Sequence, residues 1–556
     1  MEADGNEMVF AALGGLGEIG MNCAIYGFGP PKRRKWLMVD LGVSFAGEDL
    51  PGVDLILPDV SFVERIRKDL VGIVLTHAHE DHFGAVADLW PKLGAAVYAT
   101  PFAASLLEAR RLSEPGAPKV PIKLVRAGET HDIGPFSVEF ISVAHSIPES
   151  CALAIRTPAG LVVHTGDWKI DETPVLGAPT DGARLAALGA EGVDALICDS
   201  TNVLREGSSP SETEVAATLK RLVADAKGRV AVTTFASNVA RVRAAAEAAV
   251  AAGRQVVIAG RAMERVVTVA RELGMLDGLP AFLGFDALDR LARERTLLLL
   301  TGSQGEPRAA LARVAEGSHP AARLENGDTL IMSSRAIPGN EKAVSKIVNA
   351  LVERGVKVLT DRDALVHVSG HPRRDEMAKM YDWTRPRAAV PAHGEALHLA
   401  VHAEFARGRG VGNVLVARDG DLVRLAPGPA AVIDEVKHGL LYKDGDTLVP
   451  AGDPAVGDRR KLAFAGVVSI ALAVGRGGTM AGDPDVTYAG LPAKGRDGRA
   501  IDETIDEALF STFEGLSARK RSDADAVAQA IERAVRGAVG AAWGKKPVVH
   551  VLVLEV

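Results

Sequence analysis

The segment from His77 to His82, with the sequence His-Ala-His-Glu-Asp-His, holds four potential metal ligands within six residues. It follows Thr76 and the apolar run Val71–Leu75, which is typical of a buried strand. Loops after strands are where α/β proteins place their sites, and imidazole with carboxylate suits zinc, with manganese as the nearest alternative. A solvated polar loop that happens to contain three histidines is the other explanation. Histidine is scarce here, at 14 of 556 residues, so we favour hydrolytic metal chemistry.

Further candidate ligands each come after another predicted strand. The strands are Phe136–Val143, Gly160–Thr165, Ala195–Cys198 and Ala388–Ala392, and they lead to His145, Asp167, Asp199 and His393. One polar residue after a strand is more often a capping or core residue than a ligand. The recurrence of the pattern along one chain favours a shared site at the strand ends.

This order of motifs resembles the metallo-β-lactamase superfamily of dinuclear hydrolases. The resemblance implies an α/β fold, the metallo-β-lactamase αββα sandwich, with two zinc ions or manganese in their place. It implies these ligands: His77, His79 and His145 for one metal, Asp81, His82 and His393 for the other, and Asp167 as a bridge. Two metals about 3.5–4 Å apart can activate a water and stabilise both oxygens of an in-line displacement at phosphorus.

A long insertion separates Asp199 from a later motif, His367-Val-Ser-Gly-His371. Short apolar runs alternate there with Ala-rich helical segments, which predicts a parallel sheet with helices on both faces. The runs are Arg229–Thr234, Gln255–Ala259, Thr296–Thr301, Asp328–Ser333 and Gly355–Thr360. We therefore expect a second, parallel α/β domain inserted into the first.

With this insertion and motif, the chain is similar to the β-CASP nucleases, and within them to the ribonuclease J family. The resemblance covers nearly the whole chain, beginning at the glycine-rich segment Gly14–Gly20. It implies that His371 protonates the departing 3′ oxygen, which suits an imidazole titrating near neutral pH. It also implies that Asp199 orients His371, and that Asp81 is catalytic as well as a ligand.

The same resemblance implies a pocket for a terminal phosphate of the substrate. The candidates are His367, Val368, Ser369, Gly370, His371, Ser237 and Asn238. Ser, Asn and Gly are also common in ordinary turns, which is the alternative for these residues. Arg261, Arg335 and Arg373 are candidates for holding the RNA backbone, although a surface arginine is more often merely solvated.

The implied function is a metal-dependent ribonuclease for single-stranded RNA, active in mRNA decay and in the maturation of rRNA and other RNAs. It would act as a 5′-to-3′ exonuclease that prefers a 5′-monophosphate, and also as an endonuclease. The alternatives are a β-CASP DNA nuclease and a hydrolase of small esters or thioesters. His393 disfavours the first, because DNA-repair relatives tend to have valine there, and an ester hydrolase would not need the insertion or His371. A non-catalytic scaffold would have lost ligands, and all seven are present.

We expect five segments along the chain. They are residues 1–208 and 364–447 for the two parts of the metallo-β-lactamase domain, 209–363 for the β-CASP domain, 448–461 for a linker and 462–556 for a small C-terminal α/β domain. In the last, strands are predicted at 462–474, 485–488 and 548–556, and helices at 501–516 and 524–543. The resemblance suggests that it supports homodimers or homotetramers. RNA capture is the alternative, which its few aromatic residues disfavour.

Length and composition limit the number of domains and the class of protein. The length predicts about three to four domains, and 47% hydrophobic with 24% charged residues is ordinary for a globular chain. A net charge of −7 argues against non-specific coating of nucleic acid but is compatible with a locally positive cleft.

The first residues lack the pattern of a signal peptide, and the longest apolar stretch is too short for a bilayer. Cys23, Cys151 and Cys198 lie in apolar segments and are predicted to be reduced core residues. We therefore expect a cytoplasmic protein without membrane contact, with RNA-decay proteins as candidate partners. A calcium ion near Asp49, Asp54 and Asp446 is conceivable, although acidic turns of this kind are normally just solvated.

Overall fold

The computed structural model describes residues 5–337 and 339–556. The chain divides into two compact units, Met1–Ser44 with Leu57–Leu440 and Phe45–Ile56 with Leu441–Val556. The predicted α/β fold is confirmed. The first unit contains both the sandwich and the inserted domain, so the exact boundaries between them stay a prediction.

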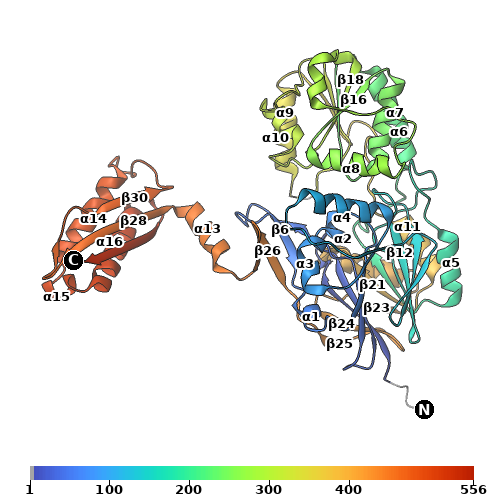
Figure 1. Ribbon diagram of the computed structural model, residues 1–556, viewed down its shortest axis with the longest axis horizontal. Helices are drawn as coiled ribbons and strands as arrows, with labels where there is room; N and C mark the ends of the chain where they lie inside the picture. The colour runs from blue at the N-terminus through green and yellow to red at the C-terminus, as the bar shows by residue number, and fades with distance from the viewer. Residues whose placement is uncertain (1–4, 338) are drawn as a thin grey trace. The chain divides into compact units, whose positions relative to one another are not determined.

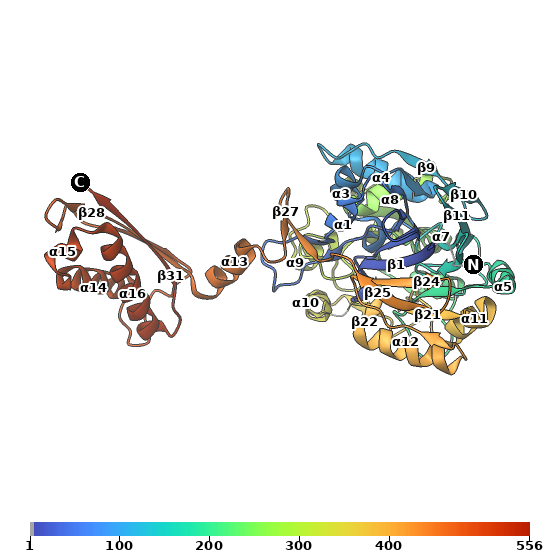
Figure 2. The ribbon, with the colours of Figure 1, turned by 90° about the horizontal axis from the view of Figure 1, so that it is seen from below.

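Two sheets face each other in the first unit (Figures 1 and 2). The first runs β25 (Ala431–Glu435), β24 (Asp421–Ala426), β1 (Glu7–Gly14), β3 (Cys23–Gly29), β4 (Lys35–Val39), β7 (Leu70–Val74), β8 (Val97–Ala99) and β9 (Ile122–Leu124). The second runs β10 (Thr130–Ile133), β11 (Phe136–Ser142), β12 (Cys151–Thr157), β13 (Gly160–His164), β14 (Ala195–Asp199), β21 (Ala388–Ala392) and β23 (Asn413–Val414). Buried side chains of both sheets form one apolar core between them, and Tyr26 of β3 contacts His164 of β13 across it at 2.8 Å.

Helices cover the outer faces of these sheets, which completes the four layers of the predicted αββα sandwich (Figure 2). On the side of the second sheet these are α5 (Gly182–Glu191), α11 (Arg374–Thr384) and α12 (Ala396–Gly408). Their apolar residues join a second core around the fully buried Trp168. On the other side lie α1 (Ser61–Arg65), α3 (Val86–Leu93) and α4 (Pro101–Ser113), while the single-turn helix α2 (Glu80–Phe83) carries part of the histidine cluster.

Strand direction explains why the predicted ligands meet. β13, β14 and β21 are parallel neighbours, and β11 runs in the same direction because two antiparallel pairings separate it from β13. In the first sheet β4 and β7 are parallel too. The carboxyl ends of these six strands carry Asp40, His77, His145, Asp167, Asp199 and His393 or lead into them. Such an edge is where open α/β sheets bind ligands.

The insertion is a six-stranded sheet in which every pairing is parallel, as predicted. Its strands are β17 (Leu283–Gly284), β16 (Gln255–Ala259), β18 (Thr296–Leu300), β15 (Val230–Thr233), β19 (Thr329–Met332) and β20 (Lys357–Leu359). The helices are α6 (Glu212–Asp225), α7 (Val239–Ala251), α8 (Arg261–Glu272), α9 (Ala310–Glu316) and α10 (Glu341–Val352), with two short 3₁₀ turns between Phe285 and Arg295. All five predicted strands are confirmed.

The second unit holds the C-terminal α/β module. Its sheet contains β28 (Val467–Gly475), β29 (Thr479–Met480), β30 (Asp485–Ala489) and β31 (Val548–Glu555), packed on α14 (Ile501–Gly515) and α16 (Ala524–Trp543), with α15 (Ala518–Arg521) between the helices in sequence. Both predicted long helices and the strands at 485 and 548 are confirmed. A further small sheet contains, in this order, β27 (Thr447–Pro450), β26 (Leu440–Asp444), β6 (Leu55–Pro58) and β5 (Ser44–Phe45).

The prediction of a strand at 462–474 was wrong for its first residues. Residues 454–465 form helix α13 (Pro454–Ala465), which also takes up most of the predicted linker at 448–461. Asp453 caps the helix by accepting the Ala455 N–H at 2.9 Å, and Pro454 occupies its first turn. A short apolar run alone does not distinguish a helix from a buried strand. Gly466, with φ of 67°, separates α13 from β28.

Two simpler predictions concern cysteine and the membrane. Cys23, Cys151 and Cys198 are free and buried, as predicted. Within residues 5–337 and 339–556, no helix combines the length and the apolar character that a membrane span requires.

Candidate metal centre and its surroundings

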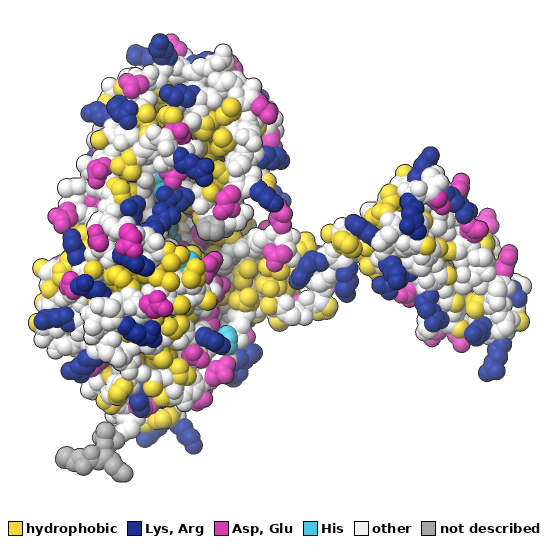
Figure 3. Space-filling view, turned by 180° about the vertical axis from the view of Figure 1, so that it is seen from behind, with side chains coloured by type: hydrophobic (Ala, Val, Ile, Leu, Met, Phe, Trp, Pro, Cys, Tyr) yellow, Lys and Arg dark blue, Asp and Glu magenta, His cyan; other side chains and the backbone are white. Residues whose placement is uncertain are grey.

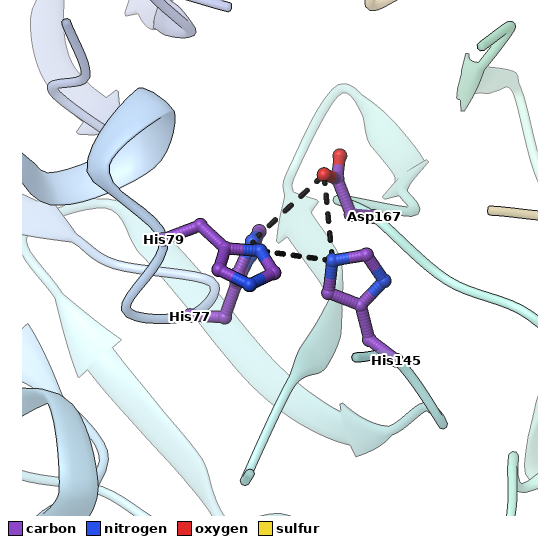
Figure 4. A group of neighbouring side chains, drawn as sticks. All are labelled: His77, His79, His145 and Asp167. Carbon is purple, nitrogen blue, oxygen red and sulfur yellow. Dashed lines mark hydrogen bonds and ion pairs between the residues drawn. The ribbon is translucent and has the colours of Figure 1, made fainter. Parts of the chain in front are cut away.

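Four side chains converge where β7, β11 and β13 end (Figure 4). His79 Nδ1 lies 3.1 Å from His77 Nε2 and 3.0 Å from His145 Nε2. Asp167 Oδ2 lies 3.8 and 3.7 Å from the same two Nε2 atoms. Tetrahedral zinc with ligands at its usual bond lengths places neighbouring donor atoms about 3.4 Å apart. The first predicted ligand set therefore has the size and donor chemistry of a divalent-metal site.

A second group shares the same aspartate. His82 Nε2 lies 3.2 Å from Asp167 Oδ2 and 3.7 Å from Asp81 Oδ2, and His393 Nε2 lies 3.4 Å from Asp81 Oδ2. His393 Nδ1 contacts Asp167 Oδ1 at 2.7 Å, which leaves Nε2 buried without a hydrogen bond. Buried polar atoms are seldom left unsatisfied. A metal ion between His82, Asp81 and His393 would account for this one.

Asp40 supports this centre and was missed by the sequence analysis. Its Oδ2 contacts His82 Nδ1 at 2.7 Å and accepts the Thr76 hydroxyl at 2.8 Å, while its Oδ1 accepts the Thr76 N–H. A carboxylate behind an imidazole fixes which nitrogen faces a metal. The signal was available, because Asp40 follows the apolar run Trp36–Val39 in the same strand-end pattern as the predicted ligands.

The backbone of the Glu80–His82 turn is held by the segment after β4. Leu41 N–H donates to the His82 carbonyl and Val43 N–H to the Glu80 carbonyl, at 2.7 and 3.0 Å. Gly42 lies between them, and a Cβ there would come 1.8 Å from the Asp81 carbonyl oxygen. Only glycine permits this approach, so residue 42 sets how deeply the turn sits in the fold.

Protonation differs between the two groups. Burial lowers the pKa of His79 to about 4 and holds the pKa values of His77 and His145 well below the usual range. Burial opposes protonation of His393 as well, but the adjacent Asp167 raises the pKa of His393 to about 10. The first group thus presents neutral imidazoles, whereas the second must release protons when a metal binds.

His371 and Asp199 form a pair beside the centre. His371 Nδ1 contacts Asp199 Oδ2 at 2.8 Å, and His371 Nε2 lies 3.9 Å from Asp167 Oδ2. Thr201 N–H donates to Asp199 Oδ1 at 2.8 Å, which holds the carboxylate in place. Burial lowers the pKa of His371, but the carboxylates of Asp199 and Asp167 outweigh it and raise the pKa above its usual value. With 19% of its side chain exposed, His371 can meet a substrate, and the raised pKa favours the protonated ring.

Two predicted phosphate-binding residues have polar atoms available. Ser369 Oγ accepts hydrogen bonds from Asn202 Nδ2 at 2.9 Å and from the His371 N–H at 3.3 Å, which leaves its own proton free to donate. His367 Nδ1 is buried and has no hydrogen-bond partner among the described residues.

The other predicted phosphate ligands have evident structural roles. Val368 is a buried core residue. Gly370 accepts the hydrogen bond of His145 Nδ1 at 2.7 Å, and a Cβ on Gly370 would come 2.5 Å from that nitrogen. Asn238 is buried and caps α7 by accepting the Arg241 N–H at 2.9 Å, while Ser237 lies half-buried just before it.

Buried Arg241, which the sequence analysis did not single out, joins the inserted domain to the His367–His371 motif. Its guanidinium makes a bidentate ion pair with Glu212, contacts the Ser333 hydroxyl at 2.7 Å and donates to the Val366 carbonyl at 2.9 Å. The charge is fully paired, as a buried charge must be. Nothing in the sequence around Arg241 distinguishes it from a surface arginine.

Basic side chains gather where the inserted domain meets the sandwich (Figure 3). Arg205 lies close enough to Arg335 and Arg373 that, after burial, their charges lower its pKa. Arg335 is paired with Asp361 at 3.0 Å, whereas Arg205 and Arg373 make no ion pair with any described residue. Locally positive potential therefore exists despite the net negative charge. Arg261, the third predicted cation, begins α8 and is not among the charges that lower the pKa of Arg205.

Two carboxyls hold the glycine-rich segment that supports His393. Asp419 Oδ1 accepts the Leu16 N–H at 3.1 Å, and Glu18 Oε1 accepts the Gly15 N–H at 3.5 Å. The Gly15 carbonyl in turn accepts the His393 N–H at 2.9 Å, where His393 has the unusual φ of 49°. This segment therefore fixes the backbone of a predicted ligand in the left-handed region.

We expect Asp419→Asn to stabilise the protein at pH 8 and to change its stability little at pH 4.5. Burial and the nearby Glu18 raise the pKa of Asp419 to about 7 in the folded state, while the unfolded chain ionises near pH 4. The folded state binds more protons in between, so its stability falls as pH rises from about 4 to 7. Asparagine can still accept the Leu16 N–H, and the gain at pH 8 should be on the order of 1–3 kcal/mol.

Thermal unfolding at the two pH values measures this difference. Exposed Asp132 provides the matched control, because Asp132→Asn removes the same charge without burial. An equal shift of Asp419→Asn at both pH values would contradict the assigned pKa.

Comparisons with protein-family models cover most of the chain. Residues 22–260 match the metallo-beta-lactamase superfamily, residues 227–351 the ribonuclease J beta-CASP domain, residues 355–416 the Zn-dependent metallo-hydrolase RNA specificity domain and residues 454–556 the ribonuclease J C-terminal domain.

Proteins that are similar to nearly the whole chain indicate the same family. The chain is 51% identical to a ribonuclease J of Sinorhizobium meliloti over 100% of this chain and 98% of the relative. It is 39% identical to that of Corynebacterium glutamicum, over 99% and 76%, and 38% identical to that of Mycobacterium tuberculosis, over 98% and 97%. A solved protein of unknown function from Enterococcus faecalis matches with a TM-score of 0.53 and 14% identity, over 75% of this chain and 100% of that one, which shows the fold alone.

Proposed function

Because the chain belongs to the ribonuclease J family of metal-dependent ribonucleases, we propose that it degrades single-stranded RNA from a 5′-monophosphate end and also cleaves RNA internally. The observation that carries this proposal is the position of His371 beside two ligand groups that share Asp167. Such a site combines metal chemistry with a protonated group for the leaving oxygen. The proposed roles are in RNA decay and maturation.

The proposed cofactor is a pair of zinc ions, with manganese as the alternative. His77, His79 and His145 would hold one ion, Asp81, His82 and His393 the other, and Asp167 would bridge them. Five imidazoles with two carboxylates favour zinc over magnesium or calcium, which prefer oxygen ligands. When bound, the ions supply Lewis-acid stabilisation at phosphorus and lower the pKa of the attacking water.

The chain's own residues would handle the leaving group. The protonated His371 can donate from Nε2 to the departing 3′ oxygen, because its Nδ1 is engaged by Asp199. Asp199 orients the ring and stabilises its charge, as its carboxylate accepts from His371 on one oxygen and from the Thr201 N–H on the other. Arg205, Arg335 and Arg373 would hold the RNA backbone.

A terminal-phosphate pocket at Ser369 and His367 is the basis of the proposed 5′ preference. The Ser369 hydroxyl proton and the unpartnered His367 Nδ1 are two polar groups that a phosphate could engage. Both belong to the turn that ends in His371, so a phosphate bound there lies at a fixed distance from the scissile bond. We propose that this distance corresponds to one nucleotide, so that each cleavage releases a mononucleotide.

The experiment compares one RNA with a 5′-monophosphate, a 5′-triphosphate or a 5′-hydroxyl, using chelated protein reloaded with zinc or manganese. We expect rapid release of mononucleotides from the monophosphate form, and no cleavage by the chelated protein. Ser369→Ala should lower this exonuclease rate about 10-fold while leaving internal cleavage in place, because it removes one phosphate contact.

Ser345→Ala, which changes a serine on α10 in the inserted domain, is the matched control for that variant. Equal internal cutting of all three RNAs would eliminate the pocket and keep the ribonuclease. Cleavage of DNA instead of RNA, or of small esters alone, would support the corresponding alternative function.

The C-terminal module is proposed to join copies of the chain into a dimer or tetramer. β31 pairs only with β28 among the described strands and so forms an edge of its sheet, and Leu552 and Leu554 on it are 58% and 52% exposed. Exposed apolar edge strands are normally covered by another chain or element.

A further inference from the structure

A buried chain of hydrogen bonds begins at Ser200, the direct neighbour of Asp199. Ser200 Oγ contacts His402 Nδ1 at 2.8 Å, and His402 Nε2 contacts the Tyr381 hydroxyl at 2.8 Å. Ser200 and His402 are fully buried and Tyr381 is 3% exposed. No part of the proposed mechanism uses these three side chains.

Only one direction of proton donation along these hydrogen bonds satisfies every donor. Burial lowers the pKa of His402 to about 3, so the ring is neutral and carries one N–H. If Tyr381 donates to Nε2, then Nδ1–H donates to Ser200, and the Ser200 hydroxyl can donate to the Cys198 carbonyl, 3.5 Å away. In the other tautomer the Tyr381 hydroxyl would have no acceptor among the described residues. Satisfaction of buried donors therefore assigns the proton to Nδ1.

The three residues come from the three segments that carry the proposed chemistry. Ser200 follows Asp199 directly, Tyr381 lies on α11, which begins at Arg374 just after His371, and His402 lies on α12, which begins at Ala396 just after His393. Packing reinforces the connection, because a Cβ on Gly394 would come 3.2 Å from the Ser200 Cβ. His402 is thus bonded to both of the other segments.

We propose that His402 is a positioning residue that, through Ser200, holds the Asp199 carboxylate in its hydrogen bond with His371. The inference rests on the proposed function, because it concerns how the leaving oxygen receives its proton. Displacement of Ser200 would move Asp199 relative to His371 and impair proton donation, while the two ligand groups keep their own supports at Asp40 and Gly370.

Two substitutions of His402 separate its two bonds. The amide of His402→Asn reaches about as far as Nδ1 and can keep the bond to Ser200, whereas His402→Gln extends toward Tyr381 and loses the bond to Ser200. We expect the Gln variant to lower kcat for RNA about 10-fold with KM and metal content unchanged, and the Asn variant to retain most of kcat.

A second substrate tests whether proton donation is the step affected. Bis(p-nitrophenyl) phosphate has a leaving group that departs without a proton, so loss of the general acid should not slow its hydrolysis. The Gln variant, and Ser200→Ala as a smaller change, should therefore lose activity on RNA and keep it on this ester. Thr384→Val is the matched control, since Thr384 is a buried hydroxyl of α11 that donates to the Met380 carbonyl in its own helix.

Each result decides the inference. Equal loss on both substrates, or loss of bound metal, would show a merely structural role and overturn it, as would equal kcat values of the Asn and Gln variants on RNA. If the unmodified protein fails to cleave RNA, the proposed function itself fails, which is a different outcome from any of these.

Discussion

Asp167→Asn is expected to lower the rate of RNA cleavage by on the order of 10³-fold or more and to reduce the metal bound per chain. Asp167 Oδ2 lies 3.2 Å from His82 Nε2 and 3.7 Å from His145 Nε2, one nitrogen in each ligand group. Asparagine keeps the shape but removes the charge that both proposed ions share. The substitution also removes the strong charged contact between Asp167 Oδ1 and His393 Nδ1, which lie 2.7 Å apart.

Metal analysis and cleavage of 5′-monophosphorylated RNA measure this effect together. Asp132→Asn provides the control for loss of one negative charge, because Asp132 is exposed on β10 and belongs to neither ligand group. If Asp167→Asn kept two metals and near-normal activity, the bridging role of Asp167 would be refuted.

His371→Ala should lower kcat for RNA by about 10²–10⁴-fold, the usual contribution of a general acid. The reason is its position, with Nδ1 bonded to Asp199 at 2.8 Å and Nε2 facing Asp167 at 3.9 Å. Metal content should remain, because the proposed ligands of both ions are other residues. Bis(p-nitrophenyl) phosphate should still be hydrolysed, because its leaving group needs no proton.

The control for His371→Ala is His438→Ala, which removes an exposed imidazole between β25 and β26 that belongs to neither ligand group. Loss of metal from the His371 variant would assign the residue to metal binding instead. Unchanged cleavage of RNA would remove it from the mechanism altogether.

Residue types and spacing were enough to predict most of the strands, the candidate site and the family of this protein. The histidine cluster, the strand-end positions of His145, Asp167 and His393, and the alternating pattern of the insertion are local features. The strands predicted before these residues and in the insertion were found close to their expected places. The resemblance carried by these motifs predicted the family, which the comparisons show. Local pattern failed at residues 462–465, where a short apolar run belongs to helix α13.

The supporting residues could not be predicted in the same way, because their roles depend on packing between distant segments. Asp40 and His82 are brought together by parallel pairing of β4 with β7, and Arg241 is identified only by its bonds to Glu212 and Val366. His402 is an ordinary helical histidine until α11 and α12 place it between Tyr381 and Ser200.

By itself the sequence determined which donor groups exist and on which local elements they lie, since strand periodicity and turn composition are properties of adjacent residues. Only the tertiary structure decided which of those groups meet. The facing of two sheets brings the His77–His82 turn against Asp167 and His393, and the direction of their strands puts every predicted ligand at one edge. Contacts between such distant segments follow from the burial of both sheets in one core, which no local pattern specifies.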